Sequence, residues 1–251
     1  MPKVRQAAFP PDAGTRGGMG GAHRLLIRLI RLITALASVA TRPDPPTHLF
    51  KRHVPDSRPT TQDAAAAEAA TPDTALLIVD MVSTWDFPDG EALLKQAAGI
   101  AANIAALKAR CRAHGVPVIY ANDNLGQWRS DFRQVVERAG AAGARGADIT
   151  HLLAPEGDDY FVLKPKHSGF HATPLELLLR HLRVQRLIIS GVAADQCVMS
   201  TAAEARMREW DVLVPADCVA SQTPERNRRA LKLFEDALCV DTRASTAIDW
   251  R

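Results

Sequence analysis

From residue 75 to the C-terminus, short apolar runs alternate with longer segments in which apolar residues recur at helical spacing. The apolar runs are 75–79, 116–121, 160–164, 186–190, 211–215 and 237–241. The segments with helical spacing include 90–114, 173–183, 195–209 and 224–236. Strands and helices that alternate in this way form right-handed βαβ units and a parallel sheet with helices on both faces. The pattern therefore predicts an α/β fold of three layers, α/β/α, with a mainly parallel six-stranded sheet.

Residues 1–72 lack this alternation and are expected to form a basic, largely disordered N-terminal extension. They have a net charge of +5 and the rest of the chain has −2, so the overall +3 originates in the extension. A glycine cluster at 17–21 and prolines at 43, 45 and 46 disfavour a packed core. We therefore expect the folded domain to span residues 73–251.

One segment of the extension has a regular pattern. Residues 24–40 could form an amphipathic helix with Arg24, Arg28 and Arg31 on one face. Its uninterrupted apolar part is nine residues long, whereas a bilayer-spanning helix needs about 20. An Ala-x-Ala at 35–37 also permits an export signal. Four cysteines without paired spacing favour a reducing compartment, so we expect a cytoplasmic protein with no membrane contact outside residues 24–40.

Three chemically distinct side chains follow or end the apolar runs. Asp80 comes directly after the run 75–79, and Lys164 ends the run 160–164. Cys197 lies beyond the run 186–190, after a glycine-containing turn and at the start of a predicted helix. Unpaired N–H groups and the helix dipole at such a position favour a thiolate. Because ligands of parallel α/β sheets bind at the carboxyl ends of the strands, these three groups are expected to converge there.

Each of the three residues also has a structural interpretation when taken alone. Free cysteines are usually packing residues, so Cys197 could belong to the core. Asp80 could cap the segment after its strand, and Lys164 could be a surface residue at a strand end. Packing is the expected role of the other cysteines, Cys111, Cys218 and Cys239. The hypothesis of a reactive site therefore depends on the combination of the three residues.

The combination resembles a known family. The stretches that carry the resemblance are LLIVDMVSTWDF (76–87), VLKPKHSGFHATPLELLL (162–179) and SGVAADQCVMSTAAEA (190–205). Their order and spacing resemble those of the isochorismatase-like cysteine hydrolases, which include nicotinamidases, carbamoyl-amide hydrolases and isochorismatase. The resemblance covers about residues 73–245 and implies a Rossmann-like hydrolase domain that assembles as a homo-oligomer.

The resemblance also implies a catalytic triad of Asp80, Lys164 and Cys197. The residue types suit this chemistry, because a carboxylate can move the thiol proton and a lysine can stabilise the neighbouring anions. In the family, the pair that matches Val192 and Ala193 carries a cis peptide that turns backbone N–H groups toward the substrate oxygen. By this analogy, the N–H groups of Ala193 and Cys197 form the oxyanion hole.

The segment after the second apolar run bears on metal binding. Nicotinamidases of the family place an Asp-x-His pair there, whereas this chain has Asn122-Asp123-Asn124-Leu125, with leucine at the second position. The histidines of the folded region lack a convincing zinc-ligand spacing. We therefore expect no metal and no other cofactor, and this departure argues against nicotinamide as the substrate.

Five residues are candidates for the substrate pocket. Asn122, Trp128 and Arg129 belong to a polar segment after the second run, which reaches the same sheet edge as the triad. Arg129 could bind a substrate carboxylate or form a structural ion pair with a nearby aspartate. Trp85 and Phe170 follow Asp80 and Lys164, and each could form an apolar pocket wall or belong to the core.

Together with these residues, the family resemblance implies a metal-independent cysteine hydrolase that cleaves a C–N bond of a small amide, ureido or carbamoyl compound through a thioester. Two alternatives stay open: a vinyl ether hydrolase of the isochorismatase type, and a non-catalytic member that binds a small metabolite or a protein. The folded region is slightly acidic and lacks clustered basic residues with interleaved aromatics. Nucleic-acid binding is therefore not expected.

Overall fold

The computed structural model describes residues 73–124, 126–129 and 131–250. The extension predicted for residues 1–72 and the amphipathic helix predicted for residues 24–40 lie outside these residues. No helix in the described part of the chain is long and apolar enough to cross a membrane.

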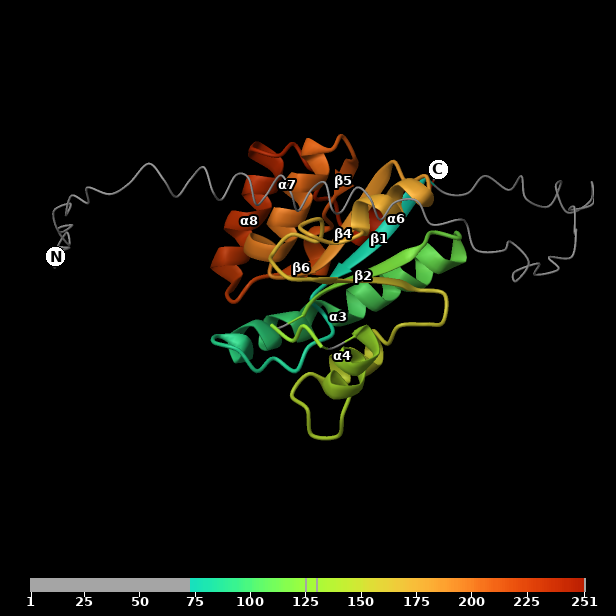
Figure 1. Ribbon diagram of the computed structural model, residues 1–251. Helices are drawn as coiled ribbons and strands as arrows, with labels where there is room; N and C mark the ends of the chain where they lie inside the picture. Colours follow the sequence, from blue (N-terminus) through green and yellow to red (C-terminus); the bar gives the residue numbers. More distant parts are fainter. Residues whose placement is uncertain (1–72, 125, 130, 251) are drawn as a thin grey trace, which may run out of the picture. The chain divides into compact units, whose positions relative to one another are not determined.

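A six-stranded sheet forms the centre of the domain (Figure 1). Its strands are β1 (Thr74–Val79), β2 (Val118–Asp123), β3 (Tyr160–Lys164), β4 (Arg186–Val192), β5 (Asp211–Leu213) and β6 (Val219–Ala220). The order is β3-β2-β1-β4-β5, and β6 pairs with the end of β4. Every ladder is parallel, so the predicted parallel α/β sheet is confirmed.

Helices cover both faces of the sheet (Figure 1). They are α3 (Gly90–Ala113), α4 (Phe132–Ala139), α5 (Ala147–Leu152), α6 (Leu175–His181), α7 (Met199–Met207) and α8 (Pro224–Asp236). Three shorter turns are the π-helical η1 (Ala194–Val198) and the 3₁₀-helical η2 (Ala216–Cys218) and η3 (Ser245–Ala247).

The two faces of β1 belong to two separate cores. Leu76 and Ile78 pack with residues of α3, α4 and α5 on one face. Leu77 and Val79 point to the other face and pack with residues of α6, α7 and α8. Successive side chains of a strand point to opposite faces, and a strand buried on both faces reads as a continuous apolar run. The run 75–79 is therefore explained by the central position of β1.

The strand predicted at 237–241 is wrong. The sixth strand is instead β6 (Val219–Ala220), which sequence analysis did not single out. Within 237–241, only Asp241 forms an isolated bridge, to Leu213 of β5. The chain leaves α8 through a turn in which Cys239 has a left-handed φ of 50°, and this conformation interrupts extended backbone. Cys239 is also exposed, so the packing role predicted for it is wrong, whereas Cys111 and Cys218 are buried as predicted.

Gly191, in the last part of β4, provides a stability test. Its φ is +107°, and an added Cβ would lie 2.0 Å from the carbonyl oxygen of Val79 in the adjacent strand. We expect Gly191→Ala to lower the free energy of unfolding in urea by more than about 2 kcal/mol. As a control, Gly99→Ala in α3 meets nothing within 4 Å and should raise it by roughly 0.5–1 kcal/mol. Equal stabilities of the two variants would contradict the described backbone contact.

Candidate active site

The structure brings Asp80, Lys164 and Cys197 together at the carboxyl edge of the sheet. Asp80 directly follows β1, Lys164 is the last residue of β3, and Cys197 lies in η1, just after β4. The Nζ atom of Lys164 lies 2.8 Å from Oδ2 of Asp80 and 3.4 Å from Sγ of Cys197. One ammonium group therefore contacts both the carboxylate and the sulfur.

Lys164 is fully buried, so it is not a surface residue at a strand end. Besides Asp80 and Cys197, its ammonium group lies 3.5 Å from Oδ2 of Asp123 and 3.4 Å from the carbonyl oxygen of Lys166. The backbone N–H of Asp123 also donates to Oδ1 of Asp80, at 2.7 Å. These contacts fix the Asp80 carboxylate and leave the buried lysine fully surrounded by acceptors, as a buried charge requires.

Burial and the neighbouring charges shift the pKa values of the three groups. It raises the pKa of Asp80, and it also raises the pKa of the Cys197 thiol, which the nearby Asp80 charge raises further. Burial alone would lower the pKa of Lys164, but the charges of Asp80 and Cys197 raise its pKa on balance. Lys164 is therefore an ammonium that compensates one anion. The 2.8 Å contact with Asp80 and the raised pKa of the Cys197 thiol favour Asp80 as that anion, with the proton on the sulfur.

This result differs from the expectation that the helix start makes Cys197 easy to ionise. The dipole argument considers only the local turn, whereas the tertiary fold removes the sulfur from water and places a carboxylate beside it. We expect the rate of Cys197 alkylation by iodoacetamide to keep rising with pH to at least about pH 9. Mass spectrometry of the modified peptide, with Cys197→Ser as the control, measures this rate. A rate that levels off near neutral pH would instead indicate a resting thiolate.

Backbone hydrogen bonds stabilise the turn that carries Cys197. The carbonyl oxygen of Ala193 accepts hydrogen bonds from the N–H groups of Gln196 at 3.0 Å and Val198 at 3.2 Å. The peptide bond between Val192 and Ala193 is cis. Both of these residues line the same cavity as Cys197.

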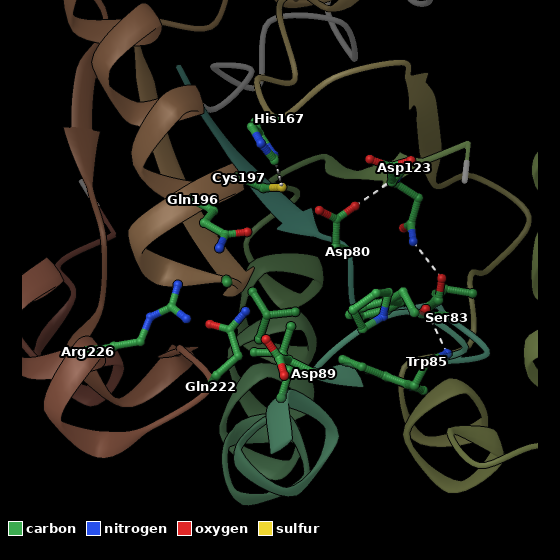
Figure 2. Close-up of a pocket in the computed structure, with 17 residues that line it drawn as sticks. Asp80, Ser83, Trp85, Asp89, Asp123, His167, Gln196, Cys197, Gln222 and Arg226 are labelled. Carbon is green, nitrogen blue, oxygen red and sulfur yellow. Dashed lines mark hydrogen bonds between the residues drawn. The ribbon is translucent and has the colours of Figure 1, made fainter. Parts of the chain in front are cut away.

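The cavity has a volume of about 280 Å³, and Asp80 and Cys197 lie in its lining (Figure 2). Its walls combine apolar and polar side chains. The apolar ones include Val82, Trp85, Phe87 and Leu93, and the polar ones include Ser83, Asn122, Asp123, His167, Gln196, Gln222 and Arg226. A small cavity with a few polar groups is typical of a small-molecule site.

Two of the five predicted pocket residues, Trp85 and Asn122, line this cavity. Trp128 and Arg129 do not line it, and both side chains are exposed. Phe170 does not line it either. Its ring packs on Trp210, with 5.3 Å between the ring centroids, in the core beneath α6 and α7.

Several site residues were missed by the sequence analysis. His167 places Nδ1 3.5 Å from Sγ of Cys197, and Asp123 contacts Lys164. Asp123 ends β2, so the rule that strand ends converge could have identified it. Gln222 lies between β6 and α8, and Arg226 lies in the first turn of α8. Both come more than 20 residues after Cys197, and no local pattern pointed to them. Across the described ranges, no group of three or more His, Cys, Asp or Glu side chains is arranged to hold a metal ion.

Comparisons with known proteins agree on one family. Residues 74–246 match the model of the isochorismatase domain. The chain is 42% identical over 169 residues to the uncharacterized isochorismatase family protein YaaI of Bacillus subtilis, covering 67% of this chain and 92% of that protein. It is 28% identical over 232 residues to the ureidoacrylate amidohydrolase RutB of Methylobacterium radiotolerans, covering 76% and 88%. The crystal structure of N-carbamoylsarcosine amidase from Thermoplasma acidophilum is similar with a TM-score of 0.53 and 25% identity, covering 70% and 98%.

Proposed function

Since this chain belongs to the isochorismatase family and has the fold of its hydrolases, we propose that it is a metal-independent amidohydrolase with Cys197 as nucleophile. Its substrate in this proposal is a small amide or ureido compound, and the bond cleaved is a C–N bond. The observation that carries the proposal is the double contact of Lys164, at 2.8 Å to Asp80 and 3.4 Å to Cys197.

The double contact supports proton transfer between sulfur and carboxylate. The buried site holds one ammonium and can balance one anion at a time. When the proton of Cys197 moves to Asp80, the negative charge moves to the sulfur and stays beside Lys164. The raised pKa of Asp80 suits a general base, because a more basic carboxylate takes the thiol proton more readily.

The proposed acylation follows from this transfer. The thiolate of Cys197 attacks the substrate carbonyl, and a tetrahedral intermediate forms with a new C–S bond. Asp80 then donates its proton to the leaving nitrogen, the C–N bond breaks, and ammonia or an amine departs. A thioester on Cys197 is left. Water attacks it while Asp80 takes a proton from the water, and the proton returns to sulfur as the carboxylic acid or carbamate departs.

Two relatives support a C–N bond as the target. The names of the ureidoacrylate amidohydrolase and the N-carbamoylsarcosine amidase describe substrates in which a ureido or carbamoyl group supplies the cleaved bond. The cavity volume of about 280 Å³ restricts such a substrate to a small molecule.

Ammonia release from a panel of small amides, ureido compounds and nicotinamide tests the proposal. We expect turnover of at least one ureido or amide compound, and we expect the rate to be unchanged when a chelator is present. Turnover that disappears with chelator and returns with a metal would contradict the metal-independent mechanism. If no compound of the panel releases ammonia, the vinyl ether hydrolase and the non-catalytic binding protein become the better hypotheses.

A further inference from the structure

Arg226 supplies a cationic group to the same cavity that contains Cys197. In Figure 2 its guanidinium lies beside Gln196 and Gln222, on the side of the cavity away from Asp123. From this arrangement we propose that Arg226 binds a carboxylate of the substrate. The substrate would then be an amide or ureido compound that also carries a carboxylate group. This inference rests on the proposed function and narrows its substrate class.

The position of Arg226 is set by its helix and by one ion pair. Thr223 caps α8, and its hydroxyl accepts a hydrogen bond from the backbone N–H of Arg226 at 3.2 Å. The Nε atom of Arg226 donates to Oδ2 of Asp195 at 2.7 Å, and the other carboxylate oxygen of Asp195 accepts from Ser221 at 2.8 Å. The guanidinium is therefore anchored to the turn that carries the nucleophile.

The anchor uses only one edge of the guanidinium. Arg226 forms its ion pair with Asp195 through Nε. Among the described residues, the two Nη groups of Arg226 have no hydrogen-bond or ion-pair partner. A guanidinium presents five N–H donors and can pair with a second carboxylate along its remaining edge. The Arg226 side chain is 37% exposed, so a ligand in the cavity can reach these donors.

Two unpartnered acceptors complement the cation. Oδ1 of Asn122 and Oε1 of Gln222 are buried and have no hydrogen-bond partner among the described residues. Both residues line the cavity. Buried polar atoms in folded proteins are normally paired, so these two acceptors indicate a ligand that brings N–H donors. A ureido or amide group supplies such donors, and the carboxylate supplies the anion for Arg226.

The other charged residues of the cavity allow this assignment. Asp80 pairs with the ammonium of Lys164 at 2.8 Å, and Asp123, which lies 3.5 Å from the same ammonium, is about one-third exposed, so solvent weakens the repulsion between Asp123 and a bound anion. Asp89 is exposed, where solvent weakens its repulsion of an anion. The sequence suggested Arg129 as the residue that binds a substrate carboxylate, but Arg129 does not line the cavity and Arg226 does. We therefore assign this role to Arg226.

The experiment compares matched acid and neutral compounds: N-carbamoylglycine with N-carbamoylglycinamide, and succinamate with succinamide. Two quantities are measured for each pair in the full-length protein, namely kcat/KM and protection of Cys197 against iodoacetamide. We expect the wild type to prefer the acid of at least one pair by tenfold or more in either quantity. In Arg226→Gln this preference should fall by roughly tenfold or more, because a charge-assisted hydrogen bond is lost. Arg226→Lys should retain part of it.

Arg229→Gln is the matched control, because Arg229 belongs to the same helix but pairs with the exposed Glu225 outside the cavity. It should leave the preference unchanged. Equal treatment of acid and neutral compounds by the wild type would overturn the inference, as would an unchanged preference in Arg226→Gln. The rate of Cys197 alkylation without ligand checks that each variant keeps a folded site. Protection of Cys197 by the acids without any turnover would support the carboxylate site and contradict the proposed hydrolysis. Turnover without a preference for the acids would support the proposed hydrolysis and contradict the carboxylate site.

Discussion

Replacing Cys197 by alanine is expected to abolish hydrolysis, with kcat reduced by roughly 10⁴-fold or more. The sulfur of Cys197 is the group that forms the thioester. No other thiol lines the cavity, because Cys111 and Cys218 are buried outside it and Cys239 is exposed outside it. Ammonia release from the best substrate of the panel measures the effect. Cys197→Ser should also be severely impaired, because a hydroxyl is far harder to deprotonate than a thiol.

Cys239→Ala is the matched control for this experiment. It removes an exposed thiol that does not line the cavity, so its activity should equal that of the wild type. If Cys197→Ala retained turnover within tenfold of the wild type, covalent catalysis by this residue would be excluded, and the vinyl ether or binding functions would have to be considered again.

Asp80→Asn is expected to change two properties in opposite directions. Turnover should fall by roughly 10³-fold, because the proton acceptor for the thiol and the proton donor for the leaving nitrogen are both lost. Alkylation of Cys197 at neutral pH should become faster. The Asp80 charge raises the pKa of Cys197 and Lys164 lowers it, so removal of the carboxylate leaves the ammonium to stabilise a thiolate.

Asp123→Asn is the comparison variant. Asp123 also contacts Lys164, but at 3.5 Å instead of 2.8 Å, so both effects should be smaller than in Asp80→Asn. Steady-state kinetics and alkylation monitored by mass spectrometry give the two rates. If Asp80→Asn slowed alkylation and turnover together, the carboxylate would be needed to ionise the thiol at rest, and the protonation states described for the site would be wrong.

Sequence reasoning was most effective where the relevant physics is local. Asp80 directly follows the apolar run 75–79, and Lys164 ends the run 160–164. The parallel topology brings strand ends to one edge, so the proximity of Asp80, Lys164 and Cys197 followed from the sheet itself. The strand predicted at 237–241 failed because a short apolar run does not by itself identify a strand; here Ala237 and Cys239 lie in the turn that follows α8, and both are exposed. The left-handed Cys239 marks the point where extended structure is interrupted.

The walls of the cavity were less accessible to prediction. Gln222 and Arg226 reach the site only because β6 pairs with the end of β4, and the two-residue β6 has no sequence pattern of its own. Phe170 and Arg129 lie close in sequence to predicted site residues, yet one faces the core and the other solvent. The ionisation of Cys197 was predicted in the wrong direction for the same reason, since its burial depends on elements distant in the chain.

The most direct test of the account is mass spectrometry of the Cys197 peptide after acid quenching during turnover of the best substrate. The proposed mechanism predicts that this peptide carries the acyl or carbamoyl group of the substrate in the wild type, and that the modification is absent from Cys197→Ala. Product formation by the wild type without any adduct on Cys197 at any time point would contradict the thioester pathway.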